Sequence, residues 1–302
     1  MPAVFLKDRS LLFVSGAEAQ SFLQNLITTD IAALGADEAR PGALLTPQGK
    51  ILFDFMIWQD RDGYTIETDA GQRDGLLKRL TMYKLRAAVT LAPSTEEGVT
   101  VSWGEDAEGA RGSQGARGSQ GARGSQGALG SQGARDSRFA KAGVTLTRRA
   151  GRQGDGAEAL YDALRIRHGI VTSGSDFALQ DAFPHDVLMD FNGGLSFRKG
   201  CYVGQEVVSR MQHRGTARRR VVTVSAATDL PGTGTEITAA GKPVGTLGSV
   251  DGGNGLAIVR IDRAGAAMAA GTPLLAGDTP VSLVLPAWSG LVFPASADEA
   301  SA

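Results

Sequence analysis

The chain has 302 residues, of which 42% are hydrophobic and 21% are charged, and its formal net charge at pH 7 is −1. This length and composition are typical of a soluble protein with two or three domains. The near-zero charge disfavours general binding to nucleic acid or to an anionic membrane surface. One cysteine cannot form an intramolecular disulfide, which fits a reducing compartment and predicts a cytoplasmic protein.

The first half of the chain alternates between predicted strands and helices. Residues 11–14 are a short apolar run that suits a strand and is too short for a secretory signal, and residues 19–26 show a helical apolar face. Residues 51–58 are apolar on both faces, as in a central strand, and Asp62-Gly63 predicts the hairpin turn that follows. A second helix is predicted at 76–83. Because no glycine-rich phosphate loop accompanies this alternation, it favours an α+β fold over a doubly wound sheet. No run reaches the roughly 18 apolar residues of a membrane span.

A repeat of Gly-Ala-Arg-Gly-Ser-Gln interrupts this pattern at residues 109–137. Glycine falls at every third position from Gly109 to Gly133, but the segment lacks the proline that a collagen helix needs. Its few apolar side chains cannot offset the loss of chain entropy on folding. We therefore interpret residues 108–137 as a disordered insertion in a surface loop. The alternative is a tether that binds an anionic partner through its arginines.

The last third of the chain changes in character. A helix predicted at 159–166 ends near Gly169, and several short runs rich in β-formers then follow one another between glycines and prolines. These runs occupy residues 221–225, 235–239, 243–250, 256–261 and 281–285. Their spacing predicts a small antiparallel barrel at 221–290, after an α+β region at 1–220 and before a tail at 291–302.

The one cysteine lies in a distinctive octapeptide, because residues 199–206 read KGCYVGQE. Arg198 and Lys199 precede Cys201, Arg214 follows it, and a helix is predicted to begin at or just after Gly204. Positive charge and the N–H groups of a helix start both stabilise a thiolate, so the pattern predicts an accessible, reactive thiol. The alternative is an inert cysteine buried beside Tyr202.

Other chemistry is less well supported by the residues. The three histidines, His168, His185 and His213, show no protease or acyltransferase signature around the cysteine, which disfavours hydrolysis. A lone cysteine cannot hold an iron–sulfur cluster or a structural zinc, but it can give one ligand to a cluster shared with another protein. The basic run at 214–220 predicts either a solvated strand entry or a site for a carboxylate-bearing ligand.

Together these motifs resemble the YgfZ-type folate-binding proteins, which are relatives of the aminomethyltransferase of the glycine cleavage system. The octapeptide carries most of the resemblance, which covers most of the chain outside the repeat. Weaker matches lie at residues 22–24, 29–30, 46–50, 83–86, 193–197 and 245–249.

The resemblance implies an α+β fold with two ferredoxin-like lobes and a C-terminal antiparallel β-barrel, arranged as a ring around a central funnel. Tetrahydrofolate or a one-carbon derivative is expected in the funnel, near the octapeptide. The expected reactive residue is Cys201, and no resident metal is expected. The expected folate contacts are Lys199, Gly200, Tyr202, Gly204, Gln205, Glu206, Tyr161, Tyr83 and Arg218.

The function implied is that of a folate-binding accessory protein that supports assembly or repair of iron–sulfur clusters in client enzymes, including tRNA-modifying ones. Its partners would be folate and the clients or cluster-assembly proteins, without direct contact to nucleic acid or membrane. The alternative is a tetrahydrofolate-dependent aminomethyl or one-carbon transferase. The position of the transferase's catalytic carboxylate falls near Leu76, with Asp74 two residues before it, and Arg167 stands where the transferase has a pterin-binding Glu. A third possibility is a binding scaffold without chemistry.

Overall fold

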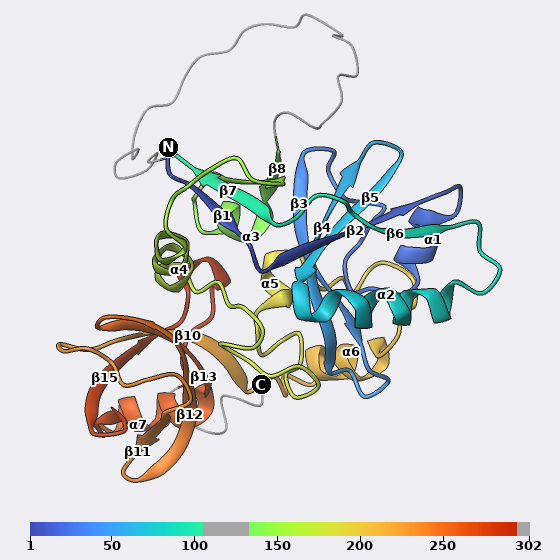
Figure 1. Ribbon diagram of the computed structural model, residues 1–302. Coiled ribbons are helices and arrows are strands. Elements are labelled where there is room, and N and C mark those ends of the chain that lie inside the picture. The colour runs from blue at the N-terminus through green and yellow to red at the C-terminus, as the bar shows by residue number, and fades with distance from the viewer. Residues whose placement is uncertain (105–132, 295–302) are drawn as a thin grey trace, which may run out of the picture.

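The structure is a computed structural model that describes residues 1–104 and 133–294 of the chain (Figure 1). The strands of the α+β part are β1 (Ala3–Leu6), β2 (Arg9–Ser15), β3 (Glu38–Leu45), β4 (Ile51–Asp60), β5 (Gly63–Asp69), β6 (Thr90–Pro93), β7 (Val99–Trp103), β8 (Ala134–Asp136) and β9 (Leu146–Ala150). The helices are α1 (Ala19–Gln24), α2 (Ala70–Lys84), α3 (Ser137–Lys141), α4 (Glu158–Arg167), α5 (Met189–Asn192), α6 (Gln205–His213) and α7 (Ile261–Ala269).

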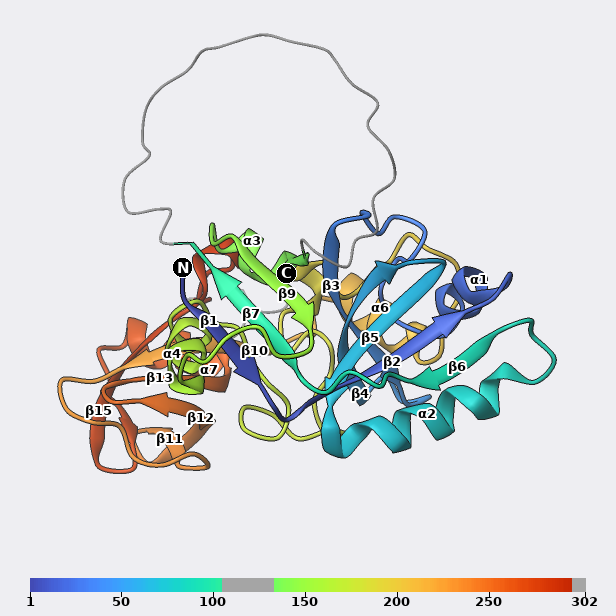
Figure 2. The same cartoon turned by 45° about the horizontal axis from the view of Figure 1, so that its top comes forward.

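In the described part of the chain, nine strands form one curled sheet in the order β1-β7-β9-β8-β3-β4-β5-β2-β6. Two halves meet in it at a single parallel contact between β3 and β8, where Ala39 lies opposite Asp136. The N-terminal strand β1 pairs with β7 in the second half, although the next strand, β2, belongs to the first half. Figure 2 shows this crossing of the chain between the halves. The chain therefore crosses between the two halves twice in its first hundred residues, once between β1 and β2 and once between β6 and β7.

The C-terminal strands close into a separate barrel. They are β10 (Arg219–Ser225), β11 (Glu236–Ala239), β12 (Lys242–Asp251), β13 (Asn254–Arg260), β14 (Leu274–Ala276) and β15 (Thr279–Val284), and a 3-10 turn follows at Ala287–Ser289. The order around the barrel is β10-β13-β12-β11-β14-β15, and β15 pairs back onto β10. Closure removes the exposed strand edges that an open sheet would present.

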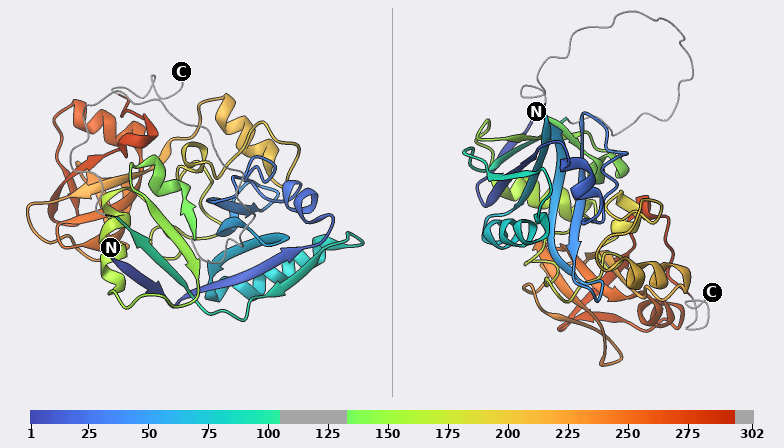
Figure 3. Two further views of the ribbon diagram at one scale, coloured as in Figure 1. Left: turned by 90° about the horizontal axis from the view of Figure 1, so that it is seen from above. Right: turned by 90° about the vertical axis from the view of Figure 1, so that its right-hand side faces the viewer.

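Figure 3 shows the barrel beside the second half of the sheet, with the first half on the other side and the loops after α4 running between them. Two apolar clusters form the cores of the two halves, one around Ile66 and Leu80 and one around Val101 and Phe139. A third cluster fills the barrel, and a fourth joins the loops after α4 to the base of the barrel. The described residues contain no helix long and apolar enough to cross a membrane.

The predicted α+β class with a C-terminal antiparallel barrel is confirmed. The predicted hairpin between β4 and β5 is present, but its turn lies one residue earlier than Asp62-Gly63, at Arg61 and Asp62, because Gly63 already pairs with Asp60. In the barrel region, β14 and α7 were not predicted, because the run that forms α7 is short, rich in alanine and carries few large apolar residues.

Most of the repeat lies outside the described residues, so the structure does not bear on its predicted disorder. The predicted end of the insertion at residue 137 is too late, since β8 begins at Ala134 and α3 at Ser137. The reason is tertiary: Ala134 is buried, and β8 lies between β3 and β9, where the sheet supplies its hydrogen-bond partners.

Candidate functional site

A central cavity of about 200 Å³ lies between the two halves of the sheet and α4. Its lining is mostly polar and comes from β1, the turn after it, β2, β4, β5, α3, β9, α4 and the loop after α4. The residues are Leu6, Asp8, Arg9, Asp54, Asp69, Arg138, Arg148, Glu158, Tyr161, Asp162, Arg165, Val171, Thr172 and Ser175. A smaller cavity of about 40 Å³ adjoins it and shares Arg9, Asp54, Arg138 and Val171. Concave sites with convergent polar groups are where ligands commonly bind, although this cavity is smaller and more polar than the usual small-molecule site of about 300–1,000 Å³.

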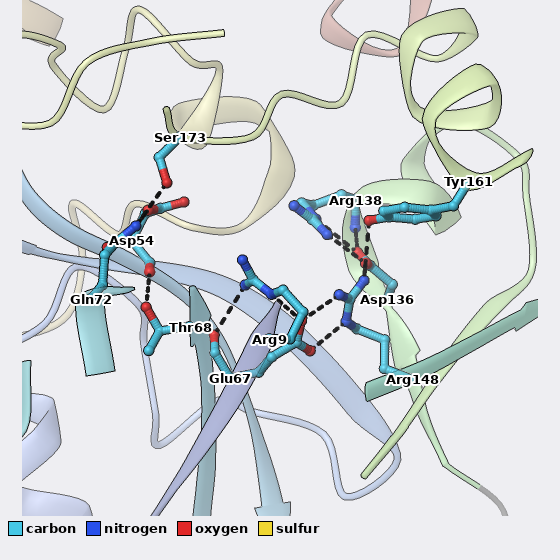
Figure 4. Close-up of polar contacts among 10 residues, drawn as sticks. All are labelled: Arg9, Asp54, Glu67, Thr68, Gln72, Asp136, Arg138, Arg148, Tyr161 and Ser173. Atoms are coloured by element: carbon cyan, nitrogen blue, oxygen red, sulfur yellow. Dashed lines mark hydrogen bonds and ion pairs between the residues drawn. The ribbon is translucent and has the colours of Figure 1, made fainter. Parts of the chain in front are cut away.

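A buried ion network forms one wall of this cavity (Figure 4). The guanidinium of Arg148 on β9 donates to Glu67 on β5, with Nη2 2.6 Å from Oε1, and to Asp136, with Nη1 2.9 Å from Oδ2. Arg9 Nε donates to Glu67 Oε1 at 2.8 Å, and Arg138 Nη2 donates to Asp136 Oδ2 at 2.8 Å. Glu67 and Asp136 are both fully buried. The network therefore joins the first half of the sheet to the second through charged groups removed from water.

The charged groups of this network keep one another ionised. Burial alone would raise the pKa of Glu67, but the charges of Arg148 and Arg9 outweigh it and lower this pKa to about 2. Burial would likewise raise the pKa of Asp136, and the charges of Arg138 and Arg148 again outweigh it and lower the pKa. Both carboxylates are thus ionised at neutral pH, and removal of one arginine would leave a buried negative charge short of a partner.

The lining of the cavity also includes two carboxylates that do not belong to the ion network, those of Asp54 and Asp69. Asp54 on β4 accepts a hydrogen bond from Gln72 Nε2 at 3.3 Å, and Asp69 caps α2 by accepting from the Gly71 N–H at 2.8 Å. Neither makes an ion pair with any residue that the structure describes. Gln72 also donates to Ser173 Oγ at 3.0 Å, while its own Oε1 is buried and has no hydrogen-bond partner among the described residues. Asp54 and Asp69 therefore offer acceptors for a ligand that carries N–H groups.

Tyr161 on α4 is the predicted folate contact that the structure does place at this cavity. The side chain is 8% exposed, its ring lies 6.0 Å from the ring of Phe139, and its hydroxyl accepts from Arg148 Nη1 at 3.4 Å. Farther along α4, Arg165 donates to Asp176 at 2.8 Å and to Ser249 of the barrel at 2.7 Å. Helix α4 is thereby fixed to both the cavity wall and the barrel.

The octapeptide lies elsewhere, and none of its residues lines the central cavities. Cys201 is exposed, so the alternative of a buried cysteine beside Tyr202 is wrong. It is Tyr202 that is buried, in the cluster that joins the loops to the barrel, where its hydroxyl donates to the Ser196 carbonyl at 3.2 Å. Burial raises the pKa of the Tyr202 hydroxyl. The chain turns the tyrosine inward and leaves the neighbouring thiol in solvent.

Lys199 does not serve as a cation beside the thiol, contrary to the prediction. Its side chain is 7% exposed, and the ammonium donates to the carbonyls of Gln24 and, at 3.0 Å, Thr29. Burial lowers the pKa of Lys199 to about 8. The Ser196 N–H adds a hydrogen bond to the Thr28 carbonyl at 2.9 Å. Lys199 is therefore an anchor that fixes the start of the cysteine loop to the segment after α1.

The other end of the cysteine loop is fixed by contact between two glycine turns. Gly204 precedes α6 with φ +78°, and a Cβ there would lie 2.5 Å from the Thr46 carbonyl oxygen and 3.1 Å from Gly49 Cα. Gly49 itself has φ +80°, and a Cβ on it would lie 3.1 Å from Val207. The turn at 46–50 and the octapeptide thus pack backbone to backbone. By contrast, a Cβ on Gly200 meets nothing within 4 Å.

The remaining predicted contacts are dispersed. Glu206 is exposed and pairs with Arg210 one turn later on α6, with 2.6 Å between its Oε1 and Nη2, while Gln205 begins that helix and is half-buried. Tyr83 packs against the core of the first half, and Arg218 lines a cavity at the base of the barrel. Neither Tyr83 nor Arg218 lines the central cavities.

Sequence reasoning did not identify Arg9, Asp54, Glu67, Asp136 and Arg148. Asp54 gave a usable signal, because it is the one charged residue in the otherwise apolar run at 51–58, and a polar residue in a central strand is informative. Asp74, which was considered for the transferase alternative, is exposed and pairs with its neighbour Arg73, away from the cavity.

Comparison with known proteins agrees with this architecture. A family model described as the C-terminal beta-barrel domain of CAF17 matches residues 218–291. The iron-sulfur cluster assembly factor IBA57, mitochondrial, of Homo sapiens is 31% identical over 280 residues, covering 84% of this chain and 76% of that protein. The chain belongs to the IBA57 family of iron–sulfur cluster assembly factors. The IBA57 homolog of Chaetomium globosum is also 31% identical, over 72% of this chain and 54% of that protein. The chain thus spans about half the length of such fungal members of the IBA57 family.

Among solved structures, the glycine cleavage system aminomethyltransferase T from Bartonella henselae superposes with a TM-score of 0.67 and 16% identity, covering 94% of this chain and 85% of that one. At 16% identity, this similarity shows that the two proteins share a fold and says nothing about a shared function. The predicted relation to iron–sulfur assembly factors with an aminomethyltransferase-like fold is confirmed, but the family shown is IBA57 rather than the YgfZ type.

The predicted cytoplasmic location is wrong, because these IBA57 relatives are named as mitochondrial proteins. The prediction rested on the absence of a disulfide. A single cysteine shows only that no intramolecular disulfide can form, and that observation does not separate the cytosol from the interior of an organelle.

The two glycines of the octapeptide should differ in their tolerance of a side chain. Gly204→Ala forces a left-handed backbone on alanine and a clash with Thr46, so we expect it to lower the free energy of unfolding by about 1–3 kcal/mol. Gly200→Ala meets open space and should change it by less than about 0.5 kcal/mol. Urea unfolding of both variants measures this difference. Equal free energies of unfolding for the two would contradict the packing of the glycine turns.

Proposed function

We propose that this protein supports the assembly or repair of iron–sulfur clusters in client enzymes, including tRNA-modifying ones, and that it acts on the cluster through Cys201. Its partners are the client enzymes or the proteins that assemble clusters. The observation that carries the proposal is the exposed thiol on a loop whose two ends are fixed by Lys199 and by Gly204. A fixed loop presents a ligand in one position, which favours transfer over random collision.

The composition of the chain limits what Cys201 can do alone. It is the one cysteine of the sequence, and no three His, Cys, Asp or Glu side chains within residues 1–104 and 133–294 gather into a metal site. Iron–sulfur clusters take several ligands, most of them thiolates. A cluster bound by Cys201 therefore draws its other ligands from a partner molecule. In this arrangement the thiol loses its proton as Sγ binds iron, and the cluster is shared cargo between the two proteins.

We propose further that the central cavity binds tetrahydrofolate, as in the YgfZ-type proteins that the octapeptide resembles. The residues present suit that group: the pterin edge carries adjacent N–H donors, and the cavity offers the carboxylates of Asp54 and Asp69 as acceptors. The ring of Tyr161 provides a flat face for stacking. When bound, tetrahydrofolate supplies a carrier for one-carbon units. In this proposal the α+β region 1–220 holds the folate, and the barrel at 221–290 supports it through the bond of Arg165 to Ser249.

The second candidate function is a tetrahydrofolate-dependent aminomethyl or one-carbon transferase. One observation favours it, namely that the cavity contains a partly buried carboxylate, Asp54, which makes no ion pair with a described residue. Such a carboxylate can accept a proton from a folate nitrogen or hold a cationic amine close to it. Asp74 cannot take this part, because it lies outside the cavity.

The role of the thiol is tested by Cys201→Ala in a strain that lacks the protein. The side chain is exposed, so we expect folding and folate binding to stay unchanged, while the activity of iron–sulfur client enzymes should fall to that of the deletion strain. Arg198→Ala, in the same loop and also exposed, is the matched control and should restore client activity. Full restoration of client enzyme activity by Cys201→Ala would show that the thiol takes no part in the mechanism.

The role of the cavity is tested by titration calorimetry with tetrahydrofolate. Loss of a hydrogen bond to a charged group costs about 1.5–3 kcal/mol, so Asp54→Asn should weaken binding about 10- to 100-fold. Asp74→Asn makes the same chemical change on the surface and should bind like the wild type. Equal affinity of the two variants for tetrahydrofolate would show that the folate does not bind against Asp54. Turnover of an aminomethyl donor that Asp54→Asn abolishes and Asp74→Asn retains would favour the transferase.

A further inference from the structure

The C-terminal end of helix α2 carries a surface that neither role proposed above uses (Figure 1). We call this surface the α2 patch, and it consists of Lys78, Arg79, Met82, Lys84, Leu85 and Arg86. Arg79 and Lys84 are half-buried, and the other side chains of the patch are exposed to solvent. The opposite face of α2 is buried in the core of the first half of the sheet through Leu76 and Leu80. No residue of the patch lines the central cavities.

Two large apolar side chains of the α2 patch project into solvent. Met82 is 60% exposed and Leu85 is 87% exposed. They are three positions apart at the end of a helix, so they are neighbours on its surface. The other large apolar side chains exposed in residues 1–104 and 133–294 are scattered over separate elements. An apolar centre with a charged rim, in which Met and Arg are frequent, is typical of a protein–protein interface.

The backbone holds Leu85 in an unfavourable conformation. Its φ of +46° and ψ of −108° are those of the first central residue of a type II′ turn, and the Ala87 N–H closes this turn by donating to the Lys84 carbonyl at 2.8 Å. Glycine suits this position, because a Cβ is crowded there. An exposed leucine gains no burial that would offset the strain. Leu85 therefore destabilises the free protein, and a partner that covers its side chain supplies the missing burial.

The α2 patch has an excess of positive charge. Residues 75–95 contain no Asp or Glu. The patch contains four cations, and none of them forms an ion pair with a residue that the structure describes: Lys78, Arg79, Lys84 and Arg86. The neighbouring carboxylate is that of Glu18, whose Oε2 accepts a hydrogen bond from the Ala88 N–H at 2.6 Å. One carboxylate against four cations leaves the excess in place, and a chain with a net charge of −1 carries it only locally.

The α2 patch and the cysteine loop are on different sides of the molecule. Figure 3 shows α2 and α6 on opposite sides of the first half of the sheet. The cysteine loop precedes α6 and is fixed to the turn at 46–50 and to the segment after α1. A protein bound to the α2 patch therefore leaves Cys201 accessible to a second molecule.

We infer that the α2 patch binds an acidic segment of a partner protein. The carboxylates of the segment lie against the four cations, and an apolar side chain of the segment covers Met82 and Leu85. Both features are needed, because exposed ion pairs alone contribute little and two apolar side chains alone bury little surface. The inference does not rest on the roles proposed for Cys201 or for the central cavity.

Two other classes of partner fit the α2 patch less well. A helix that binds an anionic membrane surface buries its apolar face in the lipid, but the apolar face of α2 is already buried in the protein core. Single-stranded nucleic acid is held by stacking of bases on aromatic side chains, and the α2 patch contains none. The strained, exposed Leu85 has no use in either case, whereas it can serve as an anchor in contact with a protein.

The test is fluorescence anisotropy of a labelled helical peptide with leucines on one face and glutamates beside them, titrated with the full chain. We expect this peptide to bind at least about 10-fold more tightly than the same peptide with glutamines, and to bind more weakly as salt is added. Lys78→Glu/Arg86→Glu should weaken binding at least about 10-fold. Lys141→Glu/Lys242→Glu makes the same change of net charge at exposed lysines outside the patch, and it should bind like the wild type.

Leu85→Gly separates a binding role from a structural one. Glycine relieves the strain of the turn, so this variant should have a higher urea midpoint than the wild type. The same variant should bind the glutamate peptide about 5-fold more weakly, because the apolar anchor is lost. Val284→Ser removes an exposed apolar side chain from β15 and should leave the affinity for the peptide unchanged.

Three kinds of result would overturn the inference. The first is equal affinity for the glutamate and glutamine peptides, or an equal loss of affinity in the two double variants. The second is a Leu85→Gly variant that binds the glutamate peptide as well as the wild type does. The third is a different occupant, shown when Lys78→Glu/Arg86→Glu abolishes tighter binding to phosphatidylcholine–phosphatidylserine vesicles or to single-stranded RNA, or dissociates a dimer of the chain in sedimentation.

Discussion

The architecture depends on one buried arginine. Arg148 lies between Glu67 of the first half of the sheet and Asp136 of the second, and all three side chains are removed from water. The parallel contact of β3 with β8 covers two residue pairs, which is too little by itself to set the angle between the halves. Ionised carboxylates that share one guanidinium impose that angle, because separation would break the Arg148–Glu67 pair and leave buried Glu67 with Arg9 as its remaining cation. The same residues form a wall of the central cavity, so the interaction that joins the halves also shapes the candidate site.

The thiol and the cavity are separate parts of one scaffold. Cys201 lies in solvent on a loop anchored by Lys199 to the segment after α1, whereas Asp54 and Tyr161 face the cavity between the halves. Folate bound in the cavity would therefore not touch the thiol directly. In the functions proposed above, the loop surface meets the iron–sulfur partner and the cavity holds the folate.

The features that are local in sequence could be predicted, and those created by long-range pairing could not. The octapeptide, the strand at 51–58 and the barrel strands each follow from short patterns of residue type. The ion network joins Glu67 to Arg148 across the repeat and to Asp136 through a strand of three residues, and no local pattern predicts that pairing. Lys199 was misassigned for a related reason, since a cation next to a cysteine in sequence can point in either direction, and here two backbone carbonyls bind it.

The most direct test of the account compares Arg148→Met with Arg135→Met. Both arginines belong to the same sheet and pair with a carboxylate, but the Arg148 pair is buried and the Arg135 pair with Asp37 is about 60% exposed on each side. The account predicts that Arg148→Met lowers the free energy of unfolding by about 3–5 kcal/mol. Arg135→Met should lower it by less than about 1 kcal/mol. Urea unfolding that finds equally small losses for the two variants would contradict the claim that the buried network holds the halves together.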